Sequence, residues 1–113
     1  MDLQTLQSAS SRELDSMVEN AKRATIFLKA LSHESRLMIL CILAESEKSV
    51  SQLEKILDLR QPTVSQQLAR LRADGLVSTR RDGKTVYYKL ASEDARIVIG
   101  AIYEVFCKKA RKK

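Results

Sequence analysis

The chain has 113 residues, 44% of them hydrophobic and 30% charged, with 3 glycines and 1 proline. This composition excludes wholesale disorder and favours one small, mainly helical domain. Lysine and arginine (20) outnumber aspartate and glutamate (14), and the net charge of +6 favours a polyanionic partner such as nucleic acid. No apolar run approaches the roughly 20 residues that cross a bilayer, and the polar, acidic start is unlike a signal peptide, so we expect a cytoplasmic protein without a membrane partner.

The first helix is predicted from a capping pattern and from helical spacing. Residues 1–10 show no pattern and are expected to form a flexible N-terminus. Ser10 and Glu13 match a capping box, in which each side chain satisfies an amide of the first turn. Apolar residues at intervals of three and four then continue to about Leu31, which predicts a helix over residues 11–31.

The second helix is predicted to be the centre of the domain. Ser32 is placed to cap it, and Glu34 lies favourably in its first turn. Its apolar positions are Leu37, Ile39, Leu40, Cys41, Ile42, Leu43 and Ala44. A helix that is apolar almost all round is buried on most sides.

A short helix, a break and a longer helix follow. Ser49 and Gln52 form a second capping box, and the chain breaks at residues 58–60. Pro62 suits the first turn of the next helix, because its missing amide costs nothing there. That helix is predicted to run to about Ala73.

After Gly75, a residue suited to a left-handed helix end, the period changes from helical to alternating. Residues 76–81 and 84–90 read as two strands on either side of Asp82-Gly83. An Asp-Gly pair between β-branched and aromatic runs is a strong hairpin signal. Ser92 then caps a last helix.

The predicted fold is mainly α with a small β-hairpin, in the order of four helices, the hairpin and a fifth helix. A short helix, a tight turn, a second helix and a hairpin form the winged helix-turn-helix arrangement. We therefore expect one DNA-binding and dimerisation domain over residues 11–109, followed by a basic C-terminal tail over residues 110–113.

The helix that begins near Gln61 has two different faces. Val64, Leu68 and Leu71 form a narrow apolar stripe that anchors it on the core. The candidate DNA-contacting residues of this helix are Gln61, Thr63, Ser65, Gln66, Gln67 and Arg70. Amides pair with adenine, hydroxyls are versatile, and arginine clamps guanine or a phosphate. A solvated helix face is the alternative interpretation of the same pattern.

The hairpin tip adds three cations to this picture. Arg80, Arg81 and Lys84 surround the Asp-Gly pair. A basic wing beside a recognition helix reaches the minor groove or its flanking phosphates. A charged tip also serves solubility, so the wing supports DNA binding only in combination with the preceding helix.

Three segments of the chain resemble the ArsR/SmtB family of repressors. They are residues 31–40 (LSHESRLMIL), residues 61–77 (QPTVSQQLARLRADGLV) and the Arg-Asp-Gly-Lys wing at 81–84, and the resemblance covers about residues 20–107. It implies a homodimer paired through the first and last helices, with recognition helices in successive major grooves, about 34 Å apart, of an imperfect inverted repeat of operator DNA. It also implies that an inducer abolishes DNA binding.

Members of this family commonly sense metals, but the usual ligand sets are missing from this sequence. Residues 51–55 lack the paired cysteines of arsenic and lead sensors, and Asp94 and Glu104 of the last helix have no histidine beside them. The single histidine, His33, stands at the start of the second helix, where a packing role is expected. We expect neither a metal site nor a cofactor.

Cys41 and Cys107 remain as candidates for sensing. Cys41 lies on an apolar helix face and fits a small hydrophobe, whereas Cys107 precedes Lys108 and Lys109, cations that lower the pKa of a thiol. Structural disulfides are rare in the cytoplasm. From chemistry alone, a packing role and a functional pair both remain open.

A cysteine in the second helix and another near the end of the last, without a metal cluster, resemble the persulfide-sensing branch of the family, the BigR- and SqrR-like repressors. In that branch a disulfide or a longer sulfur chain joins the thiols when reactive sulfur species accumulate, and the DNA is released. The resemblance implies that Cys41 and Cys107 are the redox-sensing pair. A disulfide needs Cα atoms about 4.4–6.8 Å apart, and a wider separation favours a polysulfide bridge.

Other functions are weighed against this one. Within the repressor class the alternatives are a general peroxide or electrophile sensor, a zinc- or haem-linked sensor, and a regulator with inert cysteines. An enzyme is not expected, because the sequence shows no Ser-His-Asp set, glycine-rich phosphate loop or metal pair. The basic wing disfavours a protein-interaction module that has lost DNA binding.

Overall fold

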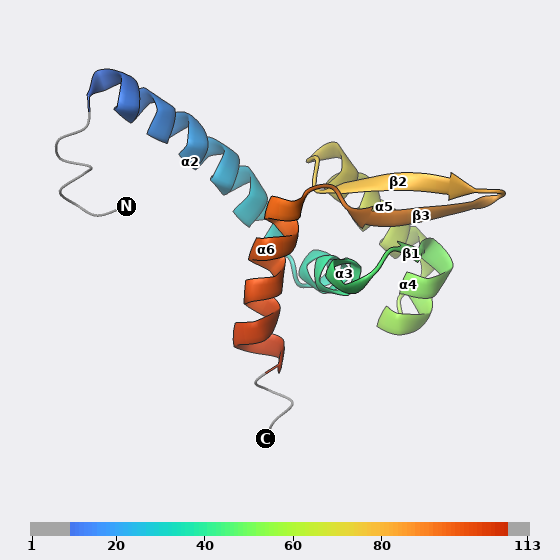
Figure 1. The fold of residues 1–113 in the computed structure, drawn as a ribbon. Coiled ribbons are helices and arrows are strands. Elements are labelled where there is room, and N and C mark those ends of the chain that lie inside the picture. The colour runs from blue at the N-terminus through green and yellow to red at the C-terminus, as the bar shows by residue number, and fades with distance from the viewer. Residues whose placement is uncertain (1–9, 109–113) are drawn as a thin grey trace.

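The computed structural model describes residues 10–108, and the side chains of residues 10–106. The predicted flexible N-terminus, apart from Ser10, and the predicted basic tail lie outside the described residues. In chain order the elements are α2 (Ser11–Leu31), α3 (Glu34–Glu45), β1 (Lys48–Ser49), α4 (Val50–Leu57), α5 (Gln61–Ala73), β2 (Val77–Asp82), β3 (Thr85–Leu90), α6 (Glu93–Ile102) and the π-helix η1 (Tyr103–Lys108) (Figure 1).

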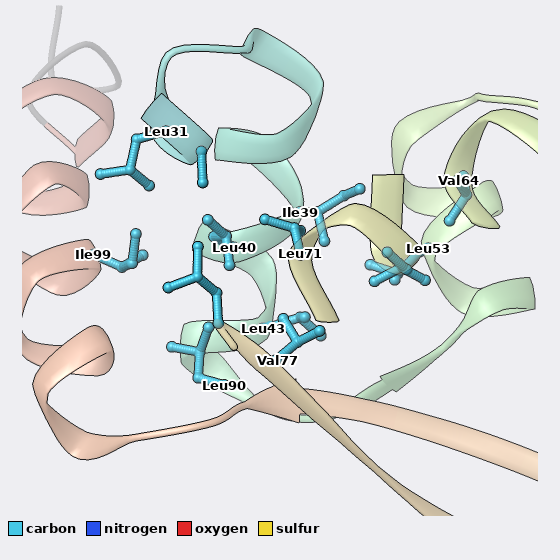
Figure 2. Close-up of a cluster of buried hydrophobic side chains, with 13 residues drawn as sticks. Leu31, Ile39, Leu40, Leu43, Leu53, Val64, Leu71, Val77, Leu90 and Ile99 are labelled. Atoms are coloured by element: carbon cyan, nitrogen blue, oxygen red, sulfur yellow. The ribbon is translucent and has the colours of Figure 1, made fainter. Parts of the chain in front are cut away.

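Helix α3 is the centre of the core, as its apolar sequence predicts. Ile39, Leu40 and Leu43 are completely buried, and they meet side chains from α2, α5, the hairpin and α6 (Figure 2). Cys41 is half-buried against the same cluster. Because α3 lies between the other elements, its position sets theirs.

The connection between α2 and α3 differs from the prediction. Ser32 does not cap α3; it ends α2, and its hydroxyl donates to the carbonyl oxygen of Lys29 at 2.7 Å. His33 occupies the N-cap position of α3, and its side chain makes no capping bond. Arg36 closes the turn, because its Nε donates to the carbonyl oxygen of Ala30 at 2.9 Å. Ser32 does not cap α3 because its hydroxyl is already bonded to the end of α2.

The helix-turn-helix is built by local signals that the sequence shows clearly. The Ser49–Gln52 capping box is present in both directions, at 2.9 and 3.2 Å. Asp58 ends α4 in the left-handed region, at φ 54°, and Pro62 lies in the first turn of α5. The predicted break at residues 58–60 and the predicted start of the helix near Gln61 are both confirmed.

Gly75 stops α5 as predicted. Its φ of +77° is left-handed, and the amides of Gly75 and Leu76 donate to the carbonyl oxygens of Arg72 (3.0 Å) and Leu71 (2.9 Å). These two bonds define a Schellman motif. Because Leu76 and Leu71 both belong to the core, the chain leaves α5 directly into the hairpin.

The hairpin is confirmed, but its loop lies one residue later than predicted, which shifts every cross-strand partner by two residues. Asp82 pairs with Thr85, so the two-residue loop is Gly83-Lys84, with φ +64° at Gly83. A positive φ at the first loop residue is the pattern of a type II′ turn. This register sets the buried side chains of Val77 and Leu90 opposite each other at the base of the hairpin.

A short strand that the sequence analysis missed completes the sheet. Strand β1 has two residues, and Lys48 and Ser49 pair with Tyr88 and Tyr87 of β3. Within the described chain the sheet is three-stranded and antiparallel, in the order β1-β3-β2. Strand β3 is therefore central, and the hairpin is joined along one edge to the segment between α3 and α4.

The last helix begins at the predicted cap and ends differently. Ser92 accepts a hydrogen bond from the amide of Ala95 at 3.1 Å, and α6 then gives way to the π-helix η1.

Large apolar side chains of α2, α6 and η1 are exposed, namely Leu14, Val18, Ile26, Leu28, Ile97, Val98, Val105 and Phe106. No helix within residues 10–108 is both long and apolar enough to cross a membrane.

The central position of α3 predicts a large effect of Leu43→Ala. Deleting a fully buried leucine side chain costs about 2–5 kcal/mol of unfolding free energy, because a cavity remains. Met38→Ala, on the same helix but at a position 46% exposed, should cost about 0.5 kcal/mol or less. Urea unfolding at one fixed protein concentration measures both, and equal losses would contradict the assignment of α3 as the centre of the core.

Candidate nucleic-acid interface and cysteine site

Helix α5 has a buried apolar face and a polar face on its opposite side. Val64, Leu68 and Leu71 are completely buried and hold the helix on the core. These residues recur at intervals of four and three, which keeps them on one side of the helix. The other side therefore points away from the core, at a fixed angle to it.

The predicted DNA-contacting residues of α5 lie on that outer side or at its borders. Gln61, Thr63, Gln66 and Arg70 are exposed, and Ser65 and Gln67 are half-buried. Arg70 has an acidic neighbour one turn later, since its Nε lies 3.5 Å from Oδ2 of Asp74. Such an exposed pair is weak, so Arg70 keeps the freedom to meet another anion.

The wing is the β2–β3 hairpin, and Figure 1 shows it projecting from the helical body on the side away from α2. Arg81, near the end of β2, and Lys84, in the turn, are both exposed. Their side chains are free to approach a polyanion at the outer end of the wing.

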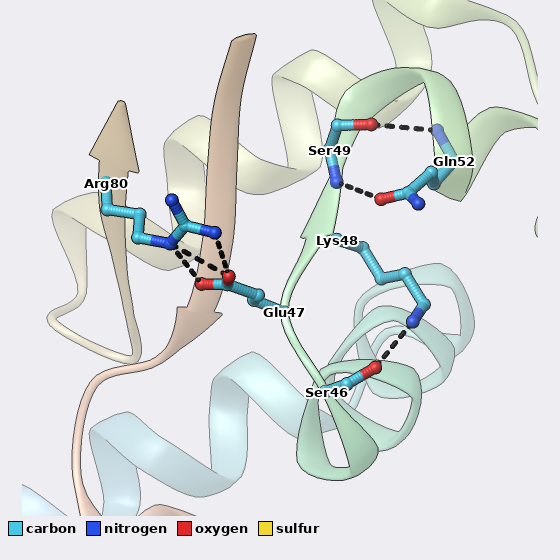
Figure 3. Close-up of polar contacts among 6 residues, drawn as sticks. All are labelled: Ser46, Glu47, Lys48, Ser49, Gln52 and Arg80. Carbon is cyan, nitrogen blue, oxygen red and sulfur yellow. Dashed lines mark hydrogen bonds and ion pairs between the residues drawn. The ribbon is translucent and has the colours of Figure 1, made fainter. Parts of the chain in front are cut away.

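Arg80, the third predicted wing cation, is held differently. Its Nε donates to both carboxylate oxygens of Glu47, at 2.8 and 2.9 Å, and its Nη2 donates to Oε1 (Figure 3). The guanidinium also lies 4.7 Å from the ring centre of Tyr87, its direct partner across the strands. We call Glu47, Arg80 and Tyr87 the wing clamp.

The electrostatics of the wing clamp keep both charges in place. Hydrogen bonds from Arg80 hold the pKa of Glu47 below its ordinary value, although partial loss of solvent acts in the opposite direction. The same bonds raise the pKa of Arg80. Glu47 is therefore ionised at neutral pH, and Arg80, whose side chain is 47% exposed, is paired with its carboxylate.

Glu47 is the residue of this region that the sequence analysis missed. It stands 33 residues before Arg80, and no local spacing connects the two positions. Pairing of β1 with β3 brings them together across the sheet. A sequence signal was available only for Arg70 and Asp74, whose i,i+4 spacing is that of a helical ion pair.

The two candidate sensor cysteines lie on α3 and on the continuation of a helix that contacts α3. Cys41 is in the middle of α3, and the backbone of Cys107 is in η1, the continuation of α6. Helices α3 and α6 pack together, and Arg96 of α6 donates a hydrogen bond to the carbonyl oxygen of Ala44. The side chain of Cys107 lies outside the described residues, so the predicted pair is placed only by its backbone elements.

The π-helix changes where position 107 lies on the last helix. In a regular α-helix, residues five apart are separated by about 140° around the axis. The wider i→i+5 ring of a π-helix reduces this angle. Ile102, the residue before η1, packs on the core cluster, so the π-helix sets the backbone of Cys107 closer to the side of Ile102 than an α-helix would.

Among the described residues, no three His, Cys, Asp or Glu side chains come close enough together to hold a metal ion. His33 is exposed at the start of α3.

Comparison with known proteins identifies the family. The family model described as "Bacterial regulatory protein, arsR family" matches residues 33–79. The biofilm growth-associated repressor of Agrobacterium fabrum is 49% identical over 94 residues, which are 83% of this chain and 80% of that protein. The transcriptional activator HlyU of Vibrio cholerae is 43% identical over 94 residues, 83% of this chain and 87% of that protein.

Solved structures show the same fold. The transcriptional repressor BigR of Xylella fastidiosa has a TM-score of 0.74 at 43% identity, over 82% of this chain and 95% of that one. Reduced HlyU of Vibrio cholerae has a TM-score of 0.77 at 42% identity, over 81% and 97%. A homodimeric winged helix-turn-helix DNA-binding domain of Mycobacterium bovis has a TM-score of 0.73 at 27% identity, over 94% of each chain.

The similarity to these relatives covers more than four fifths of this chain, well beyond residues 33–79 alone. The relatives are named as transcriptional regulators, and none of those named here is an enzyme. The expectation of a regulator rather than an enzyme is confirmed. The chain belongs to the arsR family of bacterial regulatory proteins, in the branch that contains the BigR repressors, and has their winged helix-turn-helix fold.

Proposed function

We propose that this protein is a cytoplasmic repressor that binds operator DNA while its thiols are reduced and releases it when Cys41 and Cys107 are crosslinked. The observation that carries the DNA-binding half is the outer face of α5, which is polar and cationic while its inner face is completely buried. The α5 contacts are Gln61, Thr63, Ser65, Gln66, Gln67 and Arg70. Arg81 and Lys84 of the wing add phosphate contacts.

The active form is proposed to be a homodimer paired through α2 and the α6–η1 segment. Eight large apolar side chains are exposed on these elements, and a surface of this kind marks a protein interface. A second copy fits it, because a two-fold pair sets two recognition helices on an inverted repeat. A relative of the same fold is described as homodimeric.

The sensing half of the proposal rests on the contact between α3 and α6 and on the relatives. Cys41 and Cys107 are the only two cysteines of the chain. Cys41 lies on α3, and the backbone of Cys107 lies in η1, which continues α6. A bridge between them would tie the central helix to the dimerisation helix. Coupling of about 1–3 kcal/mol, which is typical of allostery, then weakens DNA binding about 5- to 150-fold.

The crosslinking reaction balances with persulfide as the oxidant. One thiolate attacks the sulfane sulfur of a persulfide, R–S–SH, and takes it up as a cysteine persulfide while R–SH leaves. Attack by the second thiolate on the cysteine sulfur of that persulfide gives a disulfide and hydrogen sulfide. Each further persulfide inserts one sulfur atom and releases one R–SH, which gives a trisulfide or tetrasulfide bridge.

Substitutions on α5 and on the wing should have different effects on DNA binding. Gln66→Ala removes a base contact, so it should cost about 1–3 kcal/mol of binding free energy on a duplex that the wild-type protein has enriched from a random pool, and little on a scrambled duplex. Lys84→Gln should weaken binding to both duplexes and lower the slope of log affinity against log salt by about 1. Fluorescence anisotropy at several salt concentrations measures both effects.

Lys22→Gln is the matched control for these two variants. Lys22 is a surface cation whose side chain is 68% exposed, and it lies on α2, which is well away from α5 (Figure 1). It should leave affinity and salt slope unchanged. A wild-type protein that binds both duplexes weakly and without salt dependence would remove the DNA-binding proposal altogether.

Persulfide should crosslink the two cysteines and release the DNA. Peptide mass spectrometry of the reduced wild-type protein after treatment should find Cys41 joined to Cys107 through two or more sulfur atoms. Cys41→Ser and Cys107→Ser should keep their DNA under the same treatment, because neither can complete the bridge. If both variants still lose DNA, the inducer acts elsewhere; if peroxide gives the same disulfide and release, the protein is a general redox repressor.

The dimer interface can be tested by placing a charge in the exposed apolar surface. Val18→Glu on α2 is expected to shift the protein toward a monomer in sedimentation equilibrium, since a carboxylate buried without a partner opposes association. Ile56→Glu on α4, where the wild-type side chain is 52% exposed against 53% for Val18, should leave the mass unchanged. The same response from both variants would argue against pairing through α2.

A further inference from the structure

The outer half of the wing has few attachments to the body of the protein. Val77 and Leu90 are buried at its base, whereas every residue from Arg80 to Thr85 is exposed. A two-stranded hairpin is marginally stable alone. Strand β1 supports it with only two residues, so little backbone pairing fixes the outer half of the wing.

The wing clamp supplies a second attachment at the point where this support ends. Glu47 directly precedes β1, Tyr87 is on the central strand β3, and Arg80 is on β2. The guanidinium lies over the tyrosine ring and reaches the carboxylate beyond it. The three side chains therefore join all three strands (Figure 3 shows the ion pair).

We propose that Glu47 is a positioning residue for DNA binding, which holds the wing through Arg80 so that Arg81 and Lys84 reach the phosphates. This inference rests on the proposed function as a DNA-binding protein. Arg80 then acts through the protein and not on DNA. Its planar fork is matched to two carboxylate oxygens, and a phosphate contact would require it to leave both the carboxylate and the ring.

The position of Glu47 gives this attachment a further consequence. It stands in the segment that joins α3 to α4, so the clamp connects the wing to the end of the helix that carries Cys41. A movement of α3 would then carry the wing with it. The wing and the recognition helix α5 would then both move with α3.

The test compares Glu47→Gln, Arg80→Gln and the double variant with the wild type and with Arg81→Gln as the matched neighbouring cation. Binding to the enriched duplex is measured by anisotropy over a range of salt concentrations. We expect the three clamp variants to bind about fivefold more weakly, which corresponds to the upper range for an exposed ion pair. Their salt slopes should equal that of the wild type, whereas Arg81→Gln should lower the slope by about 1.

The double variant and a lysine variant make the interpretation stricter. If Glu47 and Arg80 act as one unit, the double variant binds no more weakly than either single variant. Arg80→Lys should fail to restore binding, because lysine is a point charge without the planar fork. The inference is overturned if Arg80→Gln lowers the salt slope as Arg81→Gln does, if Arg80→Lys binds as the wild type, or if Glu47→Gln leaves the affinity unchanged or raises it.

Hydrogen exchange of the free proteins separates this inference from the proposed function. The amides of β2 and β3 should exchange faster in Glu47→Gln and Arg80→Gln than in the wild type and in Arg81→Gln. This measurement needs no DNA. If exchange is unchanged in both variants, the wing clamp is overturned even when the wild type binds DNA. If the wild type binds no DNA, the proposed function is overturned, and the exchange rates alone decide whether the clamp holds the wing.

Discussion

The burial of α3 is the constraint on which the other parts of this protein depend. Ile39, Leu40 and Leu43 are completely excluded from water, and α3 contacts α2, α5, α6 and β3. Burial of three large aliphatic side chains stabilises a domain by several kcal/mol, which is a large fraction of the total for a chain of this size. The recognition helix, the wing and the last helix are therefore all positioned against one buried helix.

This arrangement separates anchoring from recognition within each element that we propose to face DNA. In α5 the buried stripe of Val64, Leu68 and Leu71 anchors the helix and leaves the polar face exposed or half-buried. In the hairpin, Val77 and Leu90 anchor the base, and the cations are carried by the outer half. Interiors are close-packed and transmit displacement, so a change in α3 reaches both elements together.

The apolar side chains exposed on α2, α6 and η1 lie on the other side of the same helix. Their burial in a dimer would extend the small core that a chain of this length can form alone. The candidate cysteines connect these two regions, since Cys41 belongs to α3 and Cys107 to the end of the proposed dimerisation element. A π-helix is rare and is often found at functional sites, and here it includes one of the two cysteines.

The sequence alone determined the features whose causes lie within one or two helical turns. The capping box at Ser49, the stop at Gly75 and the stripe that begins at Val64 depend on neighbouring backbone groups and on helical periodicity. The last two also lie in a segment that carried the family resemblance. Only the tertiary structure decided the hairpin register, which follows from packing Val77 against Leu90, and the partner of Arg80, which is brought from a distant position by strand pairing. Side-chain partners that meet through a sheet leave no periodic trace along the chain, because their spacing is set by the path of the fold.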